Sequence, residues 1–341
     1  MPRAATAGLA LVFVALSAHA AGAIETAVAE RAMASVVSVI AKGDRKNISP
    51  DEPEGSGVAV LDGRHILTAL HVFNLADDIR VRTSDGEILK AKVLGRDRAS
   101  DLALLHIERA LPVLDAGGDP GIGTRVCAIG NAFGLGLALS CGTVSAVHRA
   151  DTGFNPVEDF VQTDAAVNPG ASGGALIDEK GRLVGFLSAI FTKSADANIG
   201  VNFAISEPLG MKVARGLRDN VKMAWNFGGA ILKQVPAKGA PGRLGGRIVR
   251  VSKDTPADKA GLQIDDIVYF AGERRIRKPR DFYSVMARMI RGDSVPVLFE
   301  RNGEGMTATL KWASDNNRKR NREWIVISST CRCASFSSKS A

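Results

Sequence analysis

The sequence predicts a mainly β fold, an antiparallel barrel or sandwich followed by a smaller α+β unit. Three observations support this. Short apolar runs recur about every ten residues, separated by turn residues. Glycine occurs 36 times and aromatic residues make up only 5%, as in turn-rich proteins. No helical period appears before residues 207–222. The 341 residues, 45% of them hydrophobic, suffice for two domains.

Residues 1–23 have the pattern of a secretory signal peptide. Arg3 supplies the positive start, an apolar stretch runs from Ala7 to Ala18, and small-x-small cleavage patterns follow at 18–20 and 21–23. The alternative is an uncleaved anchor facing the periplasm, but the stretch is short and rich in alanine. We therefore expect export, to a bacterial periplasm.

The net charge of +8 is spread unevenly. Arg3 contributes +1 and residues 314–341 contribute +4, which leaves +3 for the body of the chain. This is too little to indicate a nucleic-acid partner. Residues 314–341 are expected to form a basic, disordered tail.

The first predicted domain covers residues 24–225. Its strand-like runs include Gly57–Leu61, Ile79–Arg82, Leu102–Leu105 and Leu183–Leu187. The helical segment 207–222 is expected to close this domain. A second domain over 226–313 is expected to have strands near 247–251, 266–270 and 295–301, a helix at 279–290 and an Asn302-Gly303 hairpin turn.

Three segments carry candidate chemistry. His71 ends the β-prone run 66–72, Asp101 precedes the apolar run 102–105, and Ser172 lies among glycines in the segment 161–176. Taken singly, each has an ordinary alternative: a structural histidine, a strand-capping aspartate or a glycine-rich turn. Together they follow the order His, Asp, Ser, spaced by 30 and 71 residues, which fits one double barrel. The sequence thus predicts Ser172 as nucleophile, His71 as base and Asp101 as orienting residue.

These segments resemble the HtrA/Deg family of periplasmic serine proteases. Thr68–Val72 and Ser100–Leu105 match patterns of that family, and Gly130–Gly136 and Ile199–Ile205 resemble two further segments of it. Gln162–Leu176 matches the nucleophile pattern at all but three positions, with Ala171 and Ala175 among the departures. The resemblance implies a trypsin-like double six-stranded β-barrel followed by an α+β PDZ-like domain.

The resemblance also implies site residues. The backbone N–H groups of Gly170 and Ser172 would form the oxyanion hole, and Val167, Ile190 and Phe191 would line the first specificity pocket. None of these pocket residues is acidic, so cleavage is expected after Val, Ile or Ala rather than after Lys or Arg. No metal and no cofactor are expected.

The second domain resembles a PDZ domain, which captures peptide C-termini at a sheet edge. The matching carboxylate loop contains Gly228, Gly229 and Ala230, where the family usually has larger apolar residues. Weak, backbone-driven binding of C-terminal peptides is therefore expected, with a purely structural or docking domain as the alternative.

Cys127 and Cys141 flank the 130–136 turn. In an exported protein they form either a disulfide or two buried free thiols. Cys331 and Cys333 receive no function.

The expected activity is cleavage of unfolded or misfolded proteins in the cell envelope, for protein quality control. The alternatives are a narrow regulatory protease and a catalytically weak chaperone or scaffold that binds peptides through its PDZ domain. The resemblance implies a homotrimer or a higher homo-oligomer.

Overall fold

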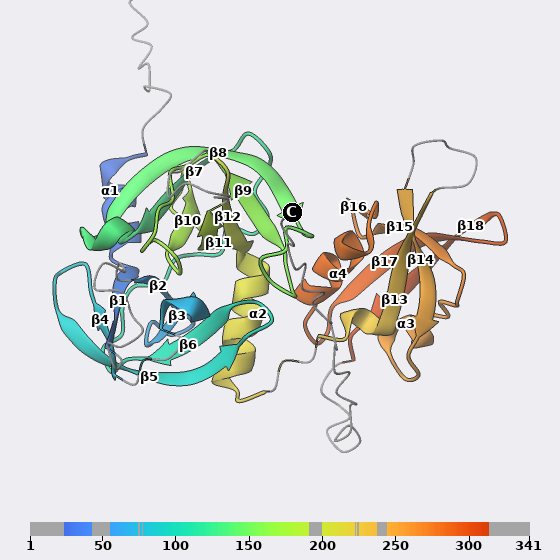
Figure 1. Ribbon diagram of the computed structural model, residues 1–341, viewed down its shortest axis with the longest axis horizontal. Coiled ribbons are helices and arrows are strands. Elements are labelled where there is room, and N and C mark those ends of the chain that lie inside the picture. Colours follow the sequence, from blue (N-terminus) through green and yellow to red (C-terminus); the bar gives the residue numbers. More distant parts are fainter. Residues whose placement is uncertain are drawn as a thin grey trace, which may run out of the picture. The chain divides into compact units, whose positions relative to one another are not determined.

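The computed structural model describes residues 24–42, 55–73, 76, 78–190, 200–221, 223, 225–236 and 244–313. The predicted signal peptide and basic tail lie outside these residues. The chain divides into two compact units (Figure 1). The first comprises the chain up to Phe227 together with Lys278–Arg288, and the second comprises Gly228–Arg277 and the chain from Met289 onward. The domain boundaries drawn from the sequence stay a prediction.

The N-terminal half of the first unit is a closed antiparallel barrel, coloured blue to cyan in Figure 1. Its strand order is β1-β2-β3-β6-β5-β4. The strands are β1 (Val36–Lys42), β2 (Gly55–Val60), β3 (His65–Ala69), β4 (Asp78–Arg82), β5 (Ile88–Asp97) and β6 (Leu102–His106). Helix α1 (Thr26–Met33) precedes the barrel, so the expectation of no helix before residue 207 was wrong; at eight residues α1 is too short to show a clear helical period.

A second closed barrel follows, with strand order β10-β11-β12-β9-β8-β7. Its strands are β7 (Arg125–Gly130), β8 (Ala138–Arg149), β9 (Phe160–Thr163), β10 (Ala175–Asp178), β11 (Leu183–Ile190) and β12 (Asn202–Ser206). Helix α2 (Glu207–Arg218) continues directly from β12. The predicted fold class, mainly β with two six-stranded barrels, is confirmed.

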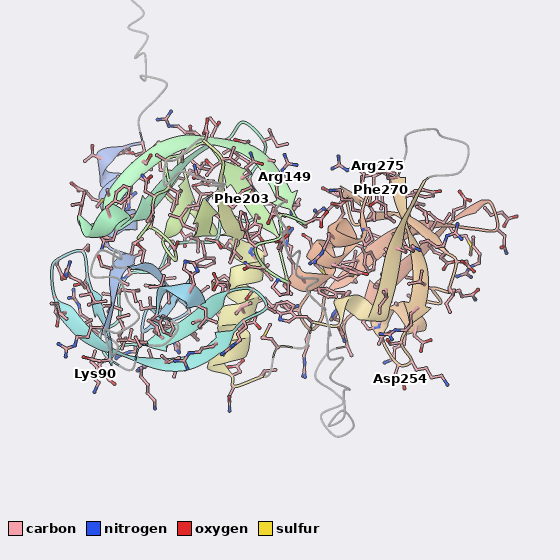
Figure 2. All side chains as sticks on the ribbon, viewed as in Figure 1. Lys90, Arg149, Phe203, Asp254, Phe270 and Arg275 are labelled. Atoms are coloured by element: carbon pink, nitrogen blue, oxygen red, sulfur yellow. A yellow bond between two sulfur atoms is a disulfide. The ribbon has the colours of Figure 1, made fainter. Side chains whose placement is uncertain are left out.

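One buried apolar cluster is shared by the two barrels. Leu67 and Leu102 of the first barrel and Phe160 and Phe203 of the second all belong to it. Phe160 and Phe203 have ring centroids 5.7 Å apart, and Figure 2 labels Phe203 among the side chains of the second barrel. Because the barrels bury apolar surface against each other, the turns at their junction have fixed relative positions.

A fully buried carboxylate, that of Asp159, lies next to the second barrel. Its oxygens accept hydrogen bonds from Ser206 Oγ (2.6 Å) and Ser284 Oγ (2.5 Å). His148 Nδ1 lies 3.1 Å and Arg288 Nε 3.5 Å away. Burial raises the pKa of Asp159, but the hydrogen bond and charge of His148 and the charge of Arg288 lower it more, so the net pKa is about 2. Ser284 and Arg288 belong to helix α4 (Pro279–Arg288), which is part of the first unit.

The second unit contains an antiparallel sheet with the path β13-β14-β15-β17-β18, and β16 pairs with β15. Asn302 and Gly303 have φ values of 53° and 92° and form the tight turn expected between β17 and β18. The elements are β13 (Ala230–Pro236), β14 (Leu244–Val251), α3 (Pro256–Lys259), β15 (Ile267–Ala271), β16 (Arg274–Arg275), β17 (Ser294–Arg301) and β18 (Glu304–Lys311). Among the described residues, no helix has the length and apolar character needed to span a bilayer.

Candidate active site

His71 and Asp101 form a tight pair at the end of the first barrel. His71 lies in the 3₁₀ turn η1 (Leu70–Val72), directly after β3. Its Nδ1 is 2.5 Å from Asp101 Oδ2, and its backbone N–H donates to Asp101 Oδ1 at 3.1 Å. A carboxylate beside Nδ1 favours the tautomer with the proton on Nδ1, which leaves the Nε2 lone pair free to accept a proton. The imidazole is half-exposed, so a substrate can reach it.

The backbone of Asp101 also holds this pair in place. Asp101 has a φ of 57°, a left-handed conformation that is uncommon outside glycine. Its carbonyl oxygen accepts the Leu70 N–H at 2.8 Å. Backbone and carboxylate together thus accept three hydrogen bonds from residues 70 and 71. Unusual backbone conformations of this kind concentrate at functional sites.

Ser172 lies in a loop between β9 and β10 that closely approaches the first barrel. Ser56 at the start of β2 donates its backbone N–H to the Ser172 carbonyl at 2.9 Å. Gly173 has a φ of 86°, and a Cβ on it would lie 2.1 Å from the Ser56 carbonyl oxygen and 2.9 Å from Ala69 N. Ala69 is only two residues from His71. The nucleophile loop therefore lies beside the strand that carries the base, and glycine is required for this approach.

Two N–H groups of this loop are available to a ligand. Gly170 N–H and Ser172 N–H donate no hydrogen bond within the part of the chain that the structure describes. Their peptide planes are nevertheless fixed, because the Pro169 carbonyl accepts from Phe133 N (2.7 Å) and the Ala171 carbonyl from Gly174 N (2.9 Å). In a trans peptide the N–H points opposite to the C=O. These two donors have the preorganisation that an oxyanion hole needs.

The Ser172 hydroxyl donates to the Ser188 carbonyl at 3.2 Å. No hydrogen bond links it to His71 among the described residues. Nucleophile–base hydrogen bonds are often absent before substrate binds. In this structure the hydroxyl is therefore bonded to the backbone of β11 rather than to the base.

The predicted specificity pocket is described only in part. Val167 is buried in the apolar cluster of the second barrel. Ile190 ends β11, and only its backbone is described. Phe191 lies outside the described residues. Ala171, one of the departures from the family pattern, is buried in the same cluster as Val167, where an amide side chain would need hydrogen-bond partners.

The predicted carboxylate loop lies at the edge of the second unit's sheet. Gly228 and Gly229 have φ values of 74° and 91°, so their backbone follows a path that suits glycine. A Cβ on Gly229 would lie 2.1 Å from Thr255 Oγ1. Ala230 is buried and begins β13, and β14 is the one strand that pairs with β13 in the part of the chain that the structure describes. A free edge next to such a loop is the arrangement that strand addition uses.

Cys127 and Cys141 lie directly opposite each other on β7 and β8. Their sulfur atoms are bonded and their Cα atoms are 4.0 Å apart. The bridge closes the hairpin whose loop presents Phe133 to Pro169. Within that loop, the Asn131 side chain accepts the Gly136 N–H at 2.7 Å.

Sequence reasoning missed two groups at this site. Ser56 was not singled out, although its hydroxyl contacts the nucleophile loop. The Ser188 carbonyl was missed too, because a backbone acceptor leaves no trace in the sequence. A cavity of about 540 Å³ lies elsewhere on the first unit and is lined by residues such as Asp62, Glu207 and Arg215. No triad residue lines it, so we assign the chemistry to the loop junction.

Comparisons with known proteins match two regions of the chain to described domain families. A model described as "Trypsin-like peptidase domain" matches residues 55–186, and a model described as "PDZ domain" matches residues 198–312. The chain is 34% identical to the "Probable periplasmic serine endoprotease DegP-like" of Pseudomonas savastanoi over 79% of this chain and 57% of the relative. The chain thus spans a little over half of that relative's length.

Other relatives match over most of their length. The chain is 35% identical to "Serine endoprotease DegS" of Escherichia coli K12, covering 81% of this chain and 82% of that protein. Among solved structures, "HtrA-type protease AlgW with tripeptide" matches with a TM-score of 0.62 and 31% identity, covering 83% of this chain and 95% of the other. A serine endoprotease from Yersinia pestis matches with a TM-score of 0.51 and 31% identity, covering 83% and 95%.

Proposed function

Because the chain belongs to the HtrA/Deg family of trypsin-like serine proteases with PDZ domains, we propose that it is a serine endopeptidase with the triad His71, Asp101 and Ser172. The observation that carries the proposal is the nucleophile loop. In this loop Ser172 lies beside the strand of His71, and the Gly170 and Ser172 N–H groups donate no hydrogen bond to any of the described residues.

The mechanism follows from these groups. Ser172 Oγ attacks the peptide carbonyl carbon while His71 Nε2 takes its proton, and Asp101 stabilises the imidazolium that forms. The carbonyl oxygen becomes an oxyanion and accepts from Gly170 N–H and Ser172 N–H. The C–N bond then breaks as His71 returns the proton to the leaving amine, which leaves an acyl-enzyme. Water, deprotonated by His71, hydrolyses the ester and restores Ser172.

The proposed substrates are unfolded or misfolded polypeptides in the cell envelope, and the proposed location is the periplasm, as in relatives whose names state it. Cleavage after small or medium aliphatic residues is proposed from Val167, Ile190 and Phe191. The oligomeric state proposed from the family is a homotrimer or a higher homo-oligomer.

The PDZ unit is proposed to bind peptide C-termini weakly. A solved relative carries a tripeptide in its title, and here Gly228 and Gly229 supply backbone donors beside the free edge of β13. The small side chains at 228–230 provide little apolar surface for the last residue of a peptide. Each absent aliphatic side chain forfeits about 1.5–3 kcal/mol of burial at most.

A second candidate role, a regulated signalling protease, is favoured by one observation. The Ser172 hydroxyl donates to the Ser188 carbonyl rather than to His71, so its proton must leave Ser188 before His71 can accept it. A narrow protease that is switched on by a signal would use such a resting state.

The test is degradation of casein by the purified chain and by the Ser172→Ala variant, with folding checked by circular dichroism. We expect turnover by the wild-type chain only. Equal turnover by both proteins would show that Ser172 is not the nucleophile. Trapping of envelope proteins on Ser172→Ala distinguishes the roles: many unrelated captured proteins indicate quality control, and one indicates signalling.

A further inference from the structure

Ser56 is fully buried, and all four of its hydrogen-bonding groups have partners. Its hydroxyl donates to the Gly170 carbonyl at 2.8 Å and accepts the Asn131 N–H at 2.8 Å. Its backbone N–H donates to the Ser172 carbonyl at 2.9 Å, and its carbonyl accepts from Thr68 Oγ1 at 2.6 Å. Two of the four bonds go to the nucleophile loop, across 114 residues of sequence in the case of Gly170.

The Ser56 hydroxyl joins the two loops that set the direction of one oxyanion donor. Gly170 N–H is oriented because the preceding carbonyl, that of Pro169, accepts from Phe133 N. Asn131 stands two residues before Phe133, and Gly170 stands directly after Pro169. The hydroxyl therefore bonds to each of the two loops, close to the Phe133–Pro169 hydrogen bond that joins them. Without the hydroxyl, the two loops lose one of their connections and can move apart.

A buried serine does not need such partners to be tolerated in this fold. Ser35 is also buried, and its hydroxyl has no hydrogen-bond partner among the described residues. The contrast shows that burial alone does not account for the bonds that Ser56 makes. A hydroxyl with both its donor and its acceptor capacity used between two loops fixes geometry more than a single bond does.

We propose that Ser56 is a positioning residue of the endopeptidase, whose hydroxyl holds the 131–136 loop against the nucleophile loop and so keeps the Gly170 N–H aimed at the oxyanion. The inference rests on the proposed endopeptidase function. The positioning of the Gly170 N–H by Ser56 stabilises the transition state rather than the bound substrate, because the substrate carbonyl gains its negative charge only in the transition state. Ser56 touches neither the substrate nor the reacting atoms.

The test compares the full-length Ser56→Ala variant with wild type and with the matched control Ser35→Ala. Steady-state cleavage of a quenched peptide gives kcat and KM separately, and a peptide boronic acid, which forms a tetrahedral adduct with Ser172, reports affinity for a transition-state mimic. Removing an oxyanion donor costs about 10²–10³ in kcat. Misdirecting one should cost part of that, so we expect kcat to fall about 10- to 100-fold.

Along with that loss we expect KM to change less than about threefold and boronate affinity to fall in parallel with kcat. Ser35→Ala should match wild type in all three quantities. All assays are run well below each variant's melting temperature, so a loss of stability alone does not move them. If Ser56→Ala does not fold, the near-isosteric Ser56→Cys variant replaces it in the test. We then expect a smaller loss of kcat and of boronate affinity.

A folded variant at position 56 with the kcat and boronate affinity of Ser35→Ala would overturn the proposal, as would a change confined to KM. Failure of the proposed function looks different: the wild-type chain itself would then show no cleavage that depends on Ser172. A Ser172-dependent wild type with an unaffected Ser56→Ala refutes only the positioning role.

Discussion

Removing the Cys127–Cys141 disulfide should destabilise the first unit and loosen the loop that supports the nucleophile. The bridge joins residues 14 apart in sequence. In the chain-entropy model, a closed loop of about 15 residues contributes about 3 kcal/mol at 25 °C. For a unit of this size that corresponds to a fall in melting temperature of about 6–12 °C.

The assay is calorimetric melting of the chain in a Cys331→Ala/Cys333→Ala background, so that only the bridge responds to reductant. Oxidised and reduced samples of the same protein are compared, because reduction keeps both sulfur atoms in place and isolates the bond from packing. Titration of the denatured samples with a thiol reagent checks that both thiols are free after reduction and blocked before it.

Two results would refute the reasoning. One is an unchanged melting curve once both thiols are shown to be free. The other is a pair of reactive thiols in the untreated, denatured protein, since the bond would then not form. Reduction should also lower peptide cleavage at temperatures where the reduced protein is still folded. The reason is that the bridged hairpin carries Phe133, whose N–H orients the Gly170 peptide.

Four further outcomes are expected. Ser172→Ala combined with His71→Ala should cost little more in kcat than either change alone, because the triad acts as a unit; additive losses would argue against this. Mass-spectrometric mapping should find cuts after Val, Ile or Ala, and predominant cuts after Lys or Arg would contradict the pocket assignment. Asp159→Asn should cost about 3–5 kcal/mol of stability at pH 6, since it breaks a buried ion pair. The folded pKa of Asp159 (about 2) lies below its reference of 3.8. The stabilisation by ionised Asp159 is therefore complete above about pH 4 and is lost as the pH falls through 2. The difference in unfolding free energy between wild type and Asp159→Asn should thus narrow between pH 4 and pH 2, and a constant difference would refute the lowered pKa. Labelled C-terminal peptides should bind the chain weakly, and amidation of their carboxylate should abolish binding; retained binding would argue against capture at Gly228 and Gly229.

The strands of both barrels were predictable where apolar runs and turn residues alternate. The predicted run Leu102–Leu105 lies within β6, and the predicted turn Asn302-Gly303 joins β17 to β18. Such features depend on neighbouring residues, so local patterns carry them. Helix α4 ends at Arg288, two residues before the predicted end, which is the usual uncertainty of a helix terminus.

The pairing of His71 with Asp101 was predictable for a different reason. A catalytic histidine and its orienting carboxylate require fixed residue types, and their order along the chain restricts the fold. The left-handed backbone of Asp101 was not predictable, because aspartate adopts that conformation only when its surroundings require it. Here three hydrogen bonds from residues 70 and 71 provide those surroundings.

The remaining part of the site depends on contacts that no local pattern encodes. Ser56 bonds to Gly170 across 114 residues and to Asn131 across 75. In the sequence, Ser56 is one serine between two glycines at the start of a strand. Nothing in the local pattern distinguishes it from Ser35 as a functional residue. Ser56 reaches the nucleophile loop only because the two barrels pack against one shared core. The roles of polar residues in such folds are therefore decided by barrel packing, and a serine's environment distinguishes a positioning hydroxyl from a tolerated one.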